Sequence, residues 1–217
     1  MDQNVILVET VPLEFDLESL GCRLRIRPGQ TKFMDRLSRL AEEAVRVARP
    51  KAVARLCGLT ILDEENVQVG EVTFSSPLLR QKMDGLGRAF PYLASEGTEL
   101  ADWSLSLSSS LEQVFASALR EVAVQQAENL LERTLLERYG IAQVSAMNPG
   151  SLKVWSLEEQ VPLFELLAPL PEKLGVTLLP SLMMRPEYSV SGVFFQTDSK
   201  FYNCQLCPNR RTPSLVT

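Results

Sequence analysis

Two cysteines near the end of the chain have a spacing that suits metal binding or redox chemistry. Cys204 and Cys207 enclose two residues, and two thiolates so placed bind one metal ion or form a redox pair. A zinc or iron–sulfur site needs further ligands, either from Cys22 and Cys57, which are the only other thiols, or from a second chain. Two reduced and inert thiols are the alternative.

The chain contains no histidine. This absence excludes Ser-His-Asp and Cys-His catalysis, histidine-containing metal sites and the commonest general base. It also means that the chain supplies no imidazole ligand to a cobalt or iron centre. Any chemistry must rest on carboxylates, cysteine, tyrosine, lysine, backbone amides or a bound cofactor, and we predict no catalytic residue.

A Pro-Gly turn within residues 147–151 is the second candidate for a site. Gly150 has no side chain to obstruct a ligand, so the backbone there can approach a flat or zwitterionic molecule. Downstream, Ser156 and Glu159 have the spacing of a capping box that opens a helix. Pro162 then implies either a single turn followed by a second helix or a kinked helix. A plain connecting turn is the alternative for the loop.

The third candidate lies in residues 183–202, where an apolar strand is interrupted by Arg-Pro-Glu-Tyr and resumes at Ser189. Taken by itself, this pattern predicts a hairpin. Met183 and Met184 would then fill gaps in the core.

The elements that must position these residues follow from the apolar pattern. Helical spacing predicts helices over residues 31–49 and about 110–139, the second ended by Gly140. Branched residues predict strands at 51–62 and 67–74. A short helix is predicted at residues 78–87.

Further strands are predicted at residues 88–95, 175–184 and 189–197, and Pro91 indicates an edge or a bend in the first of these. Strands and helices do not alternate regularly. The pattern therefore predicts an α+β fold with a mixed, largely antiparallel twisted sheet flanked by helices.

Composition narrows the class of protein. The 217 residues, 45% of them hydrophobic, suit one domain with a sizeable core, which we place at residues 1–217 with an irregular cysteine-containing tail at 203–217. The net charge of −5 makes a nucleic-acid partner unexpected. The first ten residues have neither a basic region nor a long apolar run, so we expect no membrane contact and a soluble, cytoplasmic protein.

Residues 147–202 together resemble the activation (reactivation) domain of vitamin B12-dependent methionine synthase. The resemblance rests on residues in matching order and spacing: Pro149-Gly150, Leu163-Phe164-Glu165-Leu166-Leu167, Met184, Pro186, Ser189-Val190-Ser191-Gly192 and Asp198-Ser199-Lys200. The first 109 residues are similar only in general layout. The long helix near Glu128 is similar only loosely.

The resemblance implies a function in cobalamin chemistry. Members of the family bind S-adenosylmethionine and present its methyl group to cob(II)alamin on a partner domain, while a flavodoxin-like protein supplies the electron. A stand-alone chain of this type would act in trans on a corrinoid protein or cobalamin-dependent methyltransferase, in reductive reactivation or methyl transfer for methionine biosynthesis. It would be an accessory component with little activity alone.

The resemblance also assigns residues to each ligand. The S-adenosylmethionine site would include Asn148, Pro149, Gly150, Ser151, Glu128 and Phe201. The side that faces the corrin would include Met184, Arg185, Pro186 and Glu187.

The chain departs from the family pattern at three positions. The family loop reads Arg-x-x-Pro-Gly-Tyr, whereas this chain has Ala146 and Ser151 at the two ends, and Phe201 stands where the family has a tyrosine. An arginine paired with a carboxylate contributes about 1.5–3 kcal/mol, so its absence weakens binding roughly tenfold to a hundredfold. Two other readings thus stay open: a scaffold that binds a corrinoid protein or a metal without S-adenosylmethionine, and a redox protein that uses Cys204 and Cys207.

Overall fold

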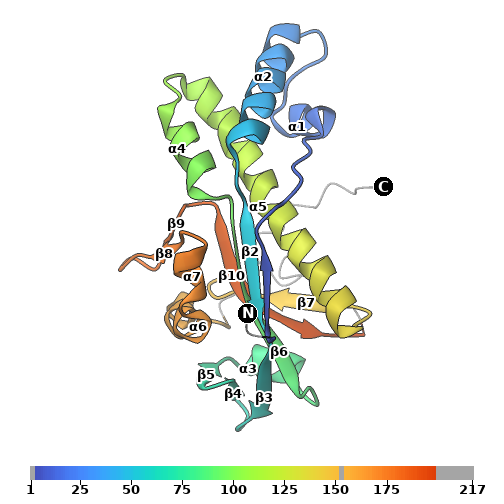
Figure 1. Cartoon of the computed structure of the whole chain (residues 1–217), viewed down its shortest axis with the longest axis vertical. Coiled ribbons are helices and arrows are strands. Elements are labelled where there is room, and N and C mark those ends of the chain that lie inside the picture. The colour runs from blue at the N-terminus through green and yellow to red at the C-terminus, as the bar shows by residue number, and fades with distance from the viewer. Residues whose placement is uncertain (1–2, 152–153, 199–217) are drawn as a thin grey trace. The chain divides into compact units, whose positions relative to one another are not determined.

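A computed structural model of the chain describes residues 3–151 and 154–198 (Figure 1). The chain divides into two compact units, and each is formed by three separate segments. Unit 1 comprises Met1–Ala54, Leu93–Thr134 and Ala168–Val190, and unit 2 comprises Arg55–Tyr92, Leu135–Leu167 and Ser191–Thr217. The single domain over residues 1–217 stays a prediction.

The expected α+β fold class is confirmed. Eight strands form one sheet: β1 (Val5–Val8), β2 (Lys51–Arg55), β6 (Arg88–Ser95), β3 (Cys57–Ile61), β4 (Asn66–Val69) and β5 (Val72–Ser75) follow one another, while β10 (Ser189–Gln196) pairs with β6 and β7 (Val144–Met147). The pairs β3·β4, β3·β6, β4·β5 and β7·β10 are all antiparallel. A second, two-stranded sheet joins β8 (Thr177–Leu178) to β9 (Met184–Arg185).

The helices are α1 (Leu17–Arg23), α2 (Thr31–Val47), α3 (Pro77–Lys82), α4 (Thr98–Ser106), α5 (Ser110–Tyr139), α6 (Gln160–Leu167) and α7 (Leu170–Lys173), with a 3₁₀ turn, η1, at Leu157–Glu159. The two long helices predicted from apolar spacing, α2 and α5, are confirmed. Gly140, at φ +61°, follows α5 directly, in the left-handed conformation that commonly ends a helix.

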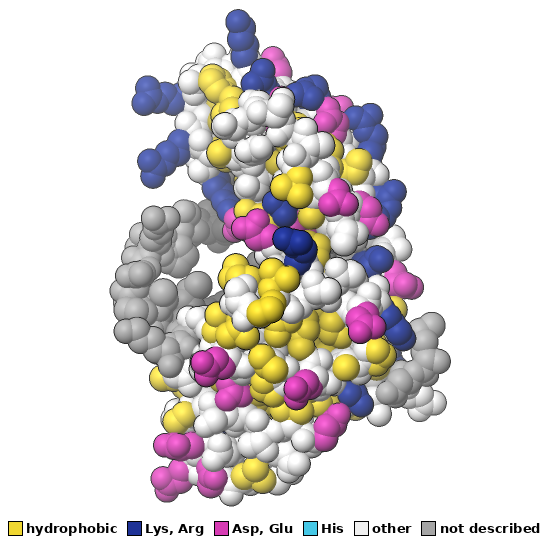
Figure 2. All heavy atoms as spheres, turned by 90° about the vertical axis from the view of Figure 1, so that its left-hand side faces the viewer, with side chains coloured by type: hydrophobic (Ala, Val, Ile, Leu, Met, Phe, Trp, Pro, Cys, Tyr) yellow, Lys and Arg dark blue, Asp and Glu magenta, His cyan; other side chains and the backbone are white. Residues whose placement is uncertain are grey.

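Unit 1 has its core between helices α1, α2, α4 and α5. The buried face of α2 supplies Leu37, Leu40 and Ala44 to this core, and each is fully buried. Leu24 and Ile26 pack against the same core, while the neighbouring Arg25 and Arg27 are exposed. Figure 2 shows Lys and Arg side chains projecting from this helical end of unit 1.

Unit 2 is held by aromatic contacts. The Tyr92 and Phe194 rings stack with centroids 3.9 Å apart, and Trp155 meets Phe74 edge-on at 5.8 Å. All four side chains are buried, and aromatic pairs contribute beyond the area that they bury. These contacts fix the residues on either side of the Pro-Gly turn.

Several strand predictions were wrong in detail. Segment 51–62 breaks at Leu56 into β2 and β3, and segment 67–74 is a hairpin of β4 and β5 that turns at Gly70 and Glu71. Gly70 has φ +60°, a conformation that glycine adopts without strain. The prediction rested on local propensity, and it therefore joined β2 with β3 and β4 with β5 into single strands.

The edge position expected for residues 88–95 was also wrong. Strand β6 is continuous, its last seven residues are buried, and it pairs with β2, β3 and β10. The pairing with β3 involves only Arg88 and Ala89 and does not reach Pro91. Burial on both faces, which no local pattern reports, makes β6 an interior strand.

Where one strand was predicted at residues 175–184, the structure has two short strands, β8 and β9. Between them the chain turns, with the Leu182 N–H donating to the Leu179 carbonyl at 2.8 Å and Leu182 at φ +65°. Pro180, which has no N–H and a fixed φ, favours a turn over a strand here. The strand predicted at residues 189–197 is confirmed as β10.

We predict that Gly192→Ala destabilises the fold by at least about 2 kcal/mol, because overpacking of a rigid interior has this order of cost. A Cβ at this position would overlap the Met147 carbonyl oxygen, and would lie 2.6 Å from Asn148 Nδ2. Urea unfolding measures the change. The control is Gly58→Ala in β3, where no atom lies within 4 Å of the added methyl; equal losses in both variants would contradict this account.

Candidate functional site

The loop predicted to bind a ligand is a β-turn in unit 2. The Ser151 N–H donates to the Asn148 carbonyl at 3.2 Å, and Gly150 has φ +77°. Pro149 followed by such a glycine is the arrangement of a type II turn. The Gly150 N–H donates to the Trp155 carbonyl at 2.9 Å, so two amides of the loop are already engaged within unit 2.

The Asn148 side chain anchors this turn. Its Nδ2 donates to the Tyr92 hydroxyl at 2.7 Å and to the Ser191 carbonyl at 2.9 Å. The Ser151 hydroxyl donates to the Asn148 carbonyl at 2.6 Å. Gly150 and Ser151 are exposed, whereas Pro149 is buried. The turn therefore presents Gly150 and Ser151 outward on a fixed base, while their role in ligand binding stays a prediction.

The capping box expected after this loop is wrong. The Ser156 hydroxyl accepts from the Glu158 N–H at 3.3 Å, and the Glu159 carboxylate accepts instead from the Ser75 N–H at 3.2 Å. A contact between residues 84 positions apart thus replaces the local one. The other expectation for this segment holds, because the 3₁₀ turn η1 leads into α6, with Pro162 in the first turn of that helix.

The segment predicted to face a corrin, residues 184–187, lies in unit 1. Arg185 and Glu187 are exposed, Met184 is half-buried and Pro186 is buried. Met183 is 54% exposed, so its alternative assignment to the core is wrong. The segment has a polar outer face with one proline turned inward.

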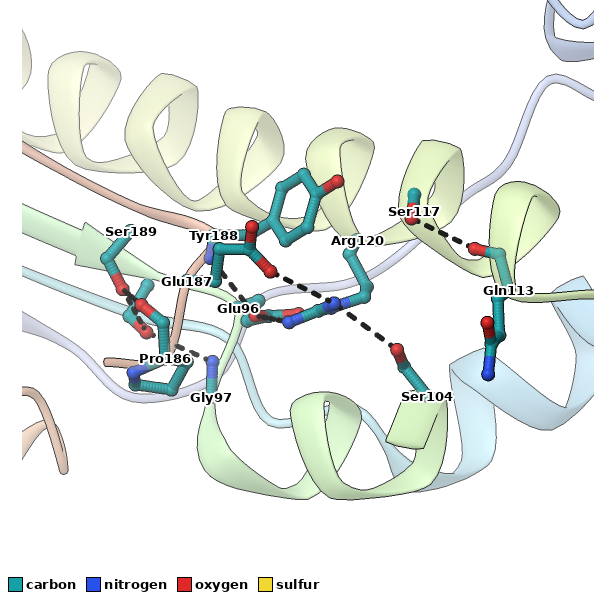
Figure 3. A network of polar contacts seen from close by, with 11 residues as sticks. Glu96, Gly97, Ser104, Gln113, Ser117, Arg120, Pro186, Glu187, Tyr188 and Ser189 are labelled. Atoms are coloured by element: carbon teal, nitrogen blue, oxygen red, sulfur yellow. Dashed lines mark hydrogen bonds and ion pairs between the residues drawn. The ribbon is translucent and has the colours of Figure 1, made fainter. Parts of the chain in front are cut away.

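A buried ion pair between Glu96 and Arg120 lies next to this segment (Figure 3). Arg120 Nε lies 2.6 Å from Glu96 Oε2, and its Nη2 lies 2.7 Å from Glu96 Oε1. Glu96 is fully buried and Arg120 is 7% exposed. Two parallel N–H···O bonds of this kind are among the stronger polar contacts in proteins.

The pair also holds Tyr188. The Glu96 N–H donates to the Tyr188 carbonyl at 3.0 Å, and the Tyr188 N–H donates back to Glu96 Oε1 at 3.2 Å. The Arg120 guanidinium lies over the Tyr188 ring, 4.4 Å from its centroid. Its Nη1 donates to the Ser104 hydroxyl at 3.2 Å and lies 3.9 Å from Glu187 Oε2. One guanidinium thus joins α5, α4, the residue after β6 and the segment between β9 and β10.

Burial and hydrogen bonding determine the ionisation of Glu96 and Arg120. Burial raises the pKa of Glu96, and the hydrogen bonds from Arg120 oppose that rise. For Arg120, burial is the largest single effect and lowers the pKa, but hydrogen bonding to Glu96 and the surrounding negative charge together outweigh it, and the pKa is raised. Because the Glu96 carboxylate accepts three N–H donors, an arrangement that suits its ionised form, we treat both groups as charged at neutral pH.

Two serine hydroxyls continue the network. Those of Ser95 and Ser189 lie 2.9 Å apart, Ser189 Oγ lies 2.8 Å from the Pro186 carbonyl, and the Gly97 N–H donates to Ser95 Oγ. Each hydroxyl has one proton, so the chain of donors runs from Gly97 through Ser95 and Ser189 to Pro186. This chain fixes the backbone of the turn before β10.

Sequence reasoning missed Glu96 and Arg120, although one signal was present. Arg120 interrupts the apolar stripe of α5 that includes Ala116, Ala123 and Ala127, all of which are buried. A charged residue within such a stripe requires a buried partner. The identity of that partner, Glu96, could not be read from the sequence.

A second feature missed by sequence reasoning is an open cavity of about 390 Å³ in unit 1. Its lining is mostly apolar, with one acidic and one basic side chain: Glu9, Thr10, Val11, Pro12, Leu13, Val45, Ala48, Arg49 and Pro50. Glu9 is exposed and directly follows strand β1, whose residues alternate between half-buried and buried. Arg49 is exposed, and its Nη1 donates to the Arg46 and Ala48 carbonyls at 3.0 and 2.7 Å.

The predicted ligand-binding residues belong to different units. Glu128 is half-buried on α5 in unit 1, and its Oε2 accepts from Gln125 Nε2 at 3.3 Å. The Asn148–Ser151 turn belongs to unit 2, whereas Glu128 and residues 184–187 belong to unit 1. Phe201, Cys204 and Cys207 lie outside the described residues.

Within residues 3–151 and 154–198, no group of three or more cysteine, aspartate or glutamate side chains could hold a metal ion. Cys22 is exposed and Cys57 is buried. Burial raises the pKa of the Cys57 thiol to about 11, so this thiol is protonated and unreactive at neutral pH. The metal site predicted at Cys204 and Cys207 stays a prediction.

Comparison with known proteins gives a relationship in fold. No family model and no curated protein match the sequence. Among solved structures, the chain is similar to the crystal structure of the MetH reactivation domain bound to AdoHcy, with a TM-score of 0.62 and 17% identity over 91% of this chain and 80% of that chain. The two therefore share a fold. None of the helices in the described part of the chain is long and apolar enough to span a membrane.

We predict that Glu159→Gln removes a pH dependence of stability. Burial raises the pKa of Glu159 above its ordinary value of 4.5, so the folded state binds its proton more tightly than the unfolded state. Stability contributed by this group is therefore lost as the pH rises from about 4.5 through the folded-state pKa. At pH 7 the variant should be at least as stable as the wild type, because glutamine still accepts from Ser75.

Chemical unfolding at pH 7 and at pH 4.5 measures this effect, with Glu165→Gln on the exposed face of α6 as the control. The wild type should gain stability relative to Glu159→Gln on acidification. A constant difference between the two proteins across this range would show that Glu159 is an ordinary solvated carboxylate.

Proposed function

We propose that this protein is an activation-type accessory protein for a corrinoid methyltransferase, and that it binds S-adenosylmethionine. The similarity in fold to a reactivation domain bound to AdoHcy carries the proposal, because AdoHcy is what S-adenosylmethionine becomes after losing its methyl group. The residues quoted above between 147 and 202 support the same family. Fold alone does not define function, so the proposal needs sites of its own on this chain.

The cavity beside Glu9 is one such site. S-adenosylmethionine carries an ammonium, a carboxylate and a sulfonium, and the cavity combines Glu9 and Arg49 with apolar walls. Glu9 would pair with a cationic group of the ligand, and Arg49 would pair with its carboxylate. This arrangement would compensate for Ala146, which stands where the family has an arginine.

Residues 184–187 would present the surface for the partner. Arg185 and Glu187 are exposed and Met184 is half-buried, which suits contact with a large molecule that has an apolar plane and polar edges. A partner protein would carry the cobalamin, which supplies the cobalt that accepts the methyl group, and a flavodoxin-like protein would supply the electron. Such a cycle implies a cytoplasmic location.

The second candidate is a scaffold that binds a corrinoid protein without S-adenosylmethionine. The loop of unit 2 favours it, because the Gly150 and Ser151 amides donate within the loop and the Ser151 hydroxyl donates to Asn148. In this case Cys204 and Cys207 could bind zinc or an iron–sulfur cluster. Metal analysis of protein purified without oxygen would test that part, and a colourless sample free of zinc and iron would contradict it.

Calorimetric titration with S-adenosylmethionine and with AdoHcy separates the two candidates. We expect saturable binding, weakened about tenfold or more by Glu9→Gln, since a hydrogen bond to a charged group contributes about 1.5–3 kcal/mol. Glu42→Gln on the exposed side of α2 is the matched control and should bind as the wild type does. An absence of heat up to millimolar ligand would leave only the scaffold.

A further inference from the structure

The Glu96–Arg120 ion pair is buried, yet it contacts an exposed segment. Arg120 reaches from α5 to Glu96, and Glu96 bonds both to the carbonyl and to the N–H of Tyr188. Glu187 Oε2, on a side chain that is 72% exposed, lies 3.9 Å from Arg120 Nη1. The pair thus connects the interior of unit 1 to the residues that adjoin Met184 and Arg185.

We propose that Glu96 and Arg120 are positioning residues that set the conformation of residues 184–188 for contact with the corrinoid partner. This inference rests on the proposed function, because it assumes that the segment meets that partner. Neither residue would touch the partner or the cobalamin. Their effect passes through Tyr188, whose backbone and ring they hold.

Three observations support a positioning role over a purely stabilising one. First, the contacts to Tyr188 are reciprocal, at 3.0 and 3.2 Å between the two residues, so they fix both the place and the orientation of its peptide groups. Second, the Tyr188 ring lies against the guanidinium at 4.4 Å. Third, a buried ion pair adds little net stability compared with apolar residues of similar volume.

One residue of the Glu96–Arg120 pair cannot be replaced alone. Arg120→Met would leave the Glu96 carboxylate buried without its ion-pair partner, and an uncompensated buried charge is strongly destabilising. The variant could unfold without any information on positioning. The double variant Glu96→Met with Arg120→Met removes both charges and retains similar volume, so its fold should persist.

Hydrogen–deuterium exchange of the full chain tests the positioning directly. In the double methionine variant the amides near Tyr188 should exchange at least tenfold faster than in the wild type, while those of α2 exchange as before. The control is Arg39→Met with Glu112→Met, which removes another ion pair of unit 1, 2.7 Å long and at the surface. It should leave exchange near Tyr188 unchanged. Exchange within twofold of the wild type in a folded Glu96→Met, Arg120→Met protein would overturn the proposal.

A binding measurement tests the link to the partner. The probe is the cobalamin-binding domain of a methionine synthase loaded with hydroxocobalamin, and its affinity should fall at least tenfold in the double methionine variant but not in the control. Faster exchange with unchanged affinity would overturn the functional part of the inference and leave the proposed function standing. If the wild type itself binds no corrinoid protein, the proposed function fails, while exchange still decides whether the pair positions Tyr188.

Discussion

The bidentate contact between Glu96 and Arg120 constrains how several elements of unit 1 can meet. Both groups are almost fully removed from water, and burying either charge alone would cost several kcal/mol. The pair is therefore viable only when β6, α4 and α5 meet in one arrangement. Because Ser104 and Tyr188 complete the shell around the guanidinium, the arrangement of helices also dictates where the chain passes between β9 and β10.

The two segments predicted to bind ligands share one feature, a polar side chain that bonds to the backbone nearby. In unit 1 the carboxylate of Glu96 accepts from the backbone of Tyr188, and in unit 2 the amide of Asn148 donates to the carbonyl of Ser191. A partly or fully buried polar side chain thus holds the backbone near each segment. The exposed residues of the segment lie close to this fixed point in the chain. Such preorganisation reduces the conformational entropy that binding would otherwise cost.

The chain shares its fold with the MetH reactivation domain at only 17% identity. A fold therefore places fewer demands on the sequence than a ligand site does. Packing needs apolar residues at buried positions and tolerates many choices. A ligand site needs particular groups, and here Ala146 lies within β7, opposite Phe194 of β10, without any group that could pair with a carboxylate.

By itself the sequence determined the two long helices, strand β10 and the α+β class, because apolar periodicity reports directly on which side of an element is buried. It also located the Pro-Gly turn, since Pro149 has a fixed φ and Gly150 accepts the positive φ that a type II turn requires. Tertiary structure alone decided that β6 is an interior strand, that Glu159 bonds to Ser75 rather than to its own helix, and that Glu96 is the partner of Arg120. Each of these depends on residues far apart in the chain, and the free energy of burying a charge or a strand edge is settled only when those residues meet.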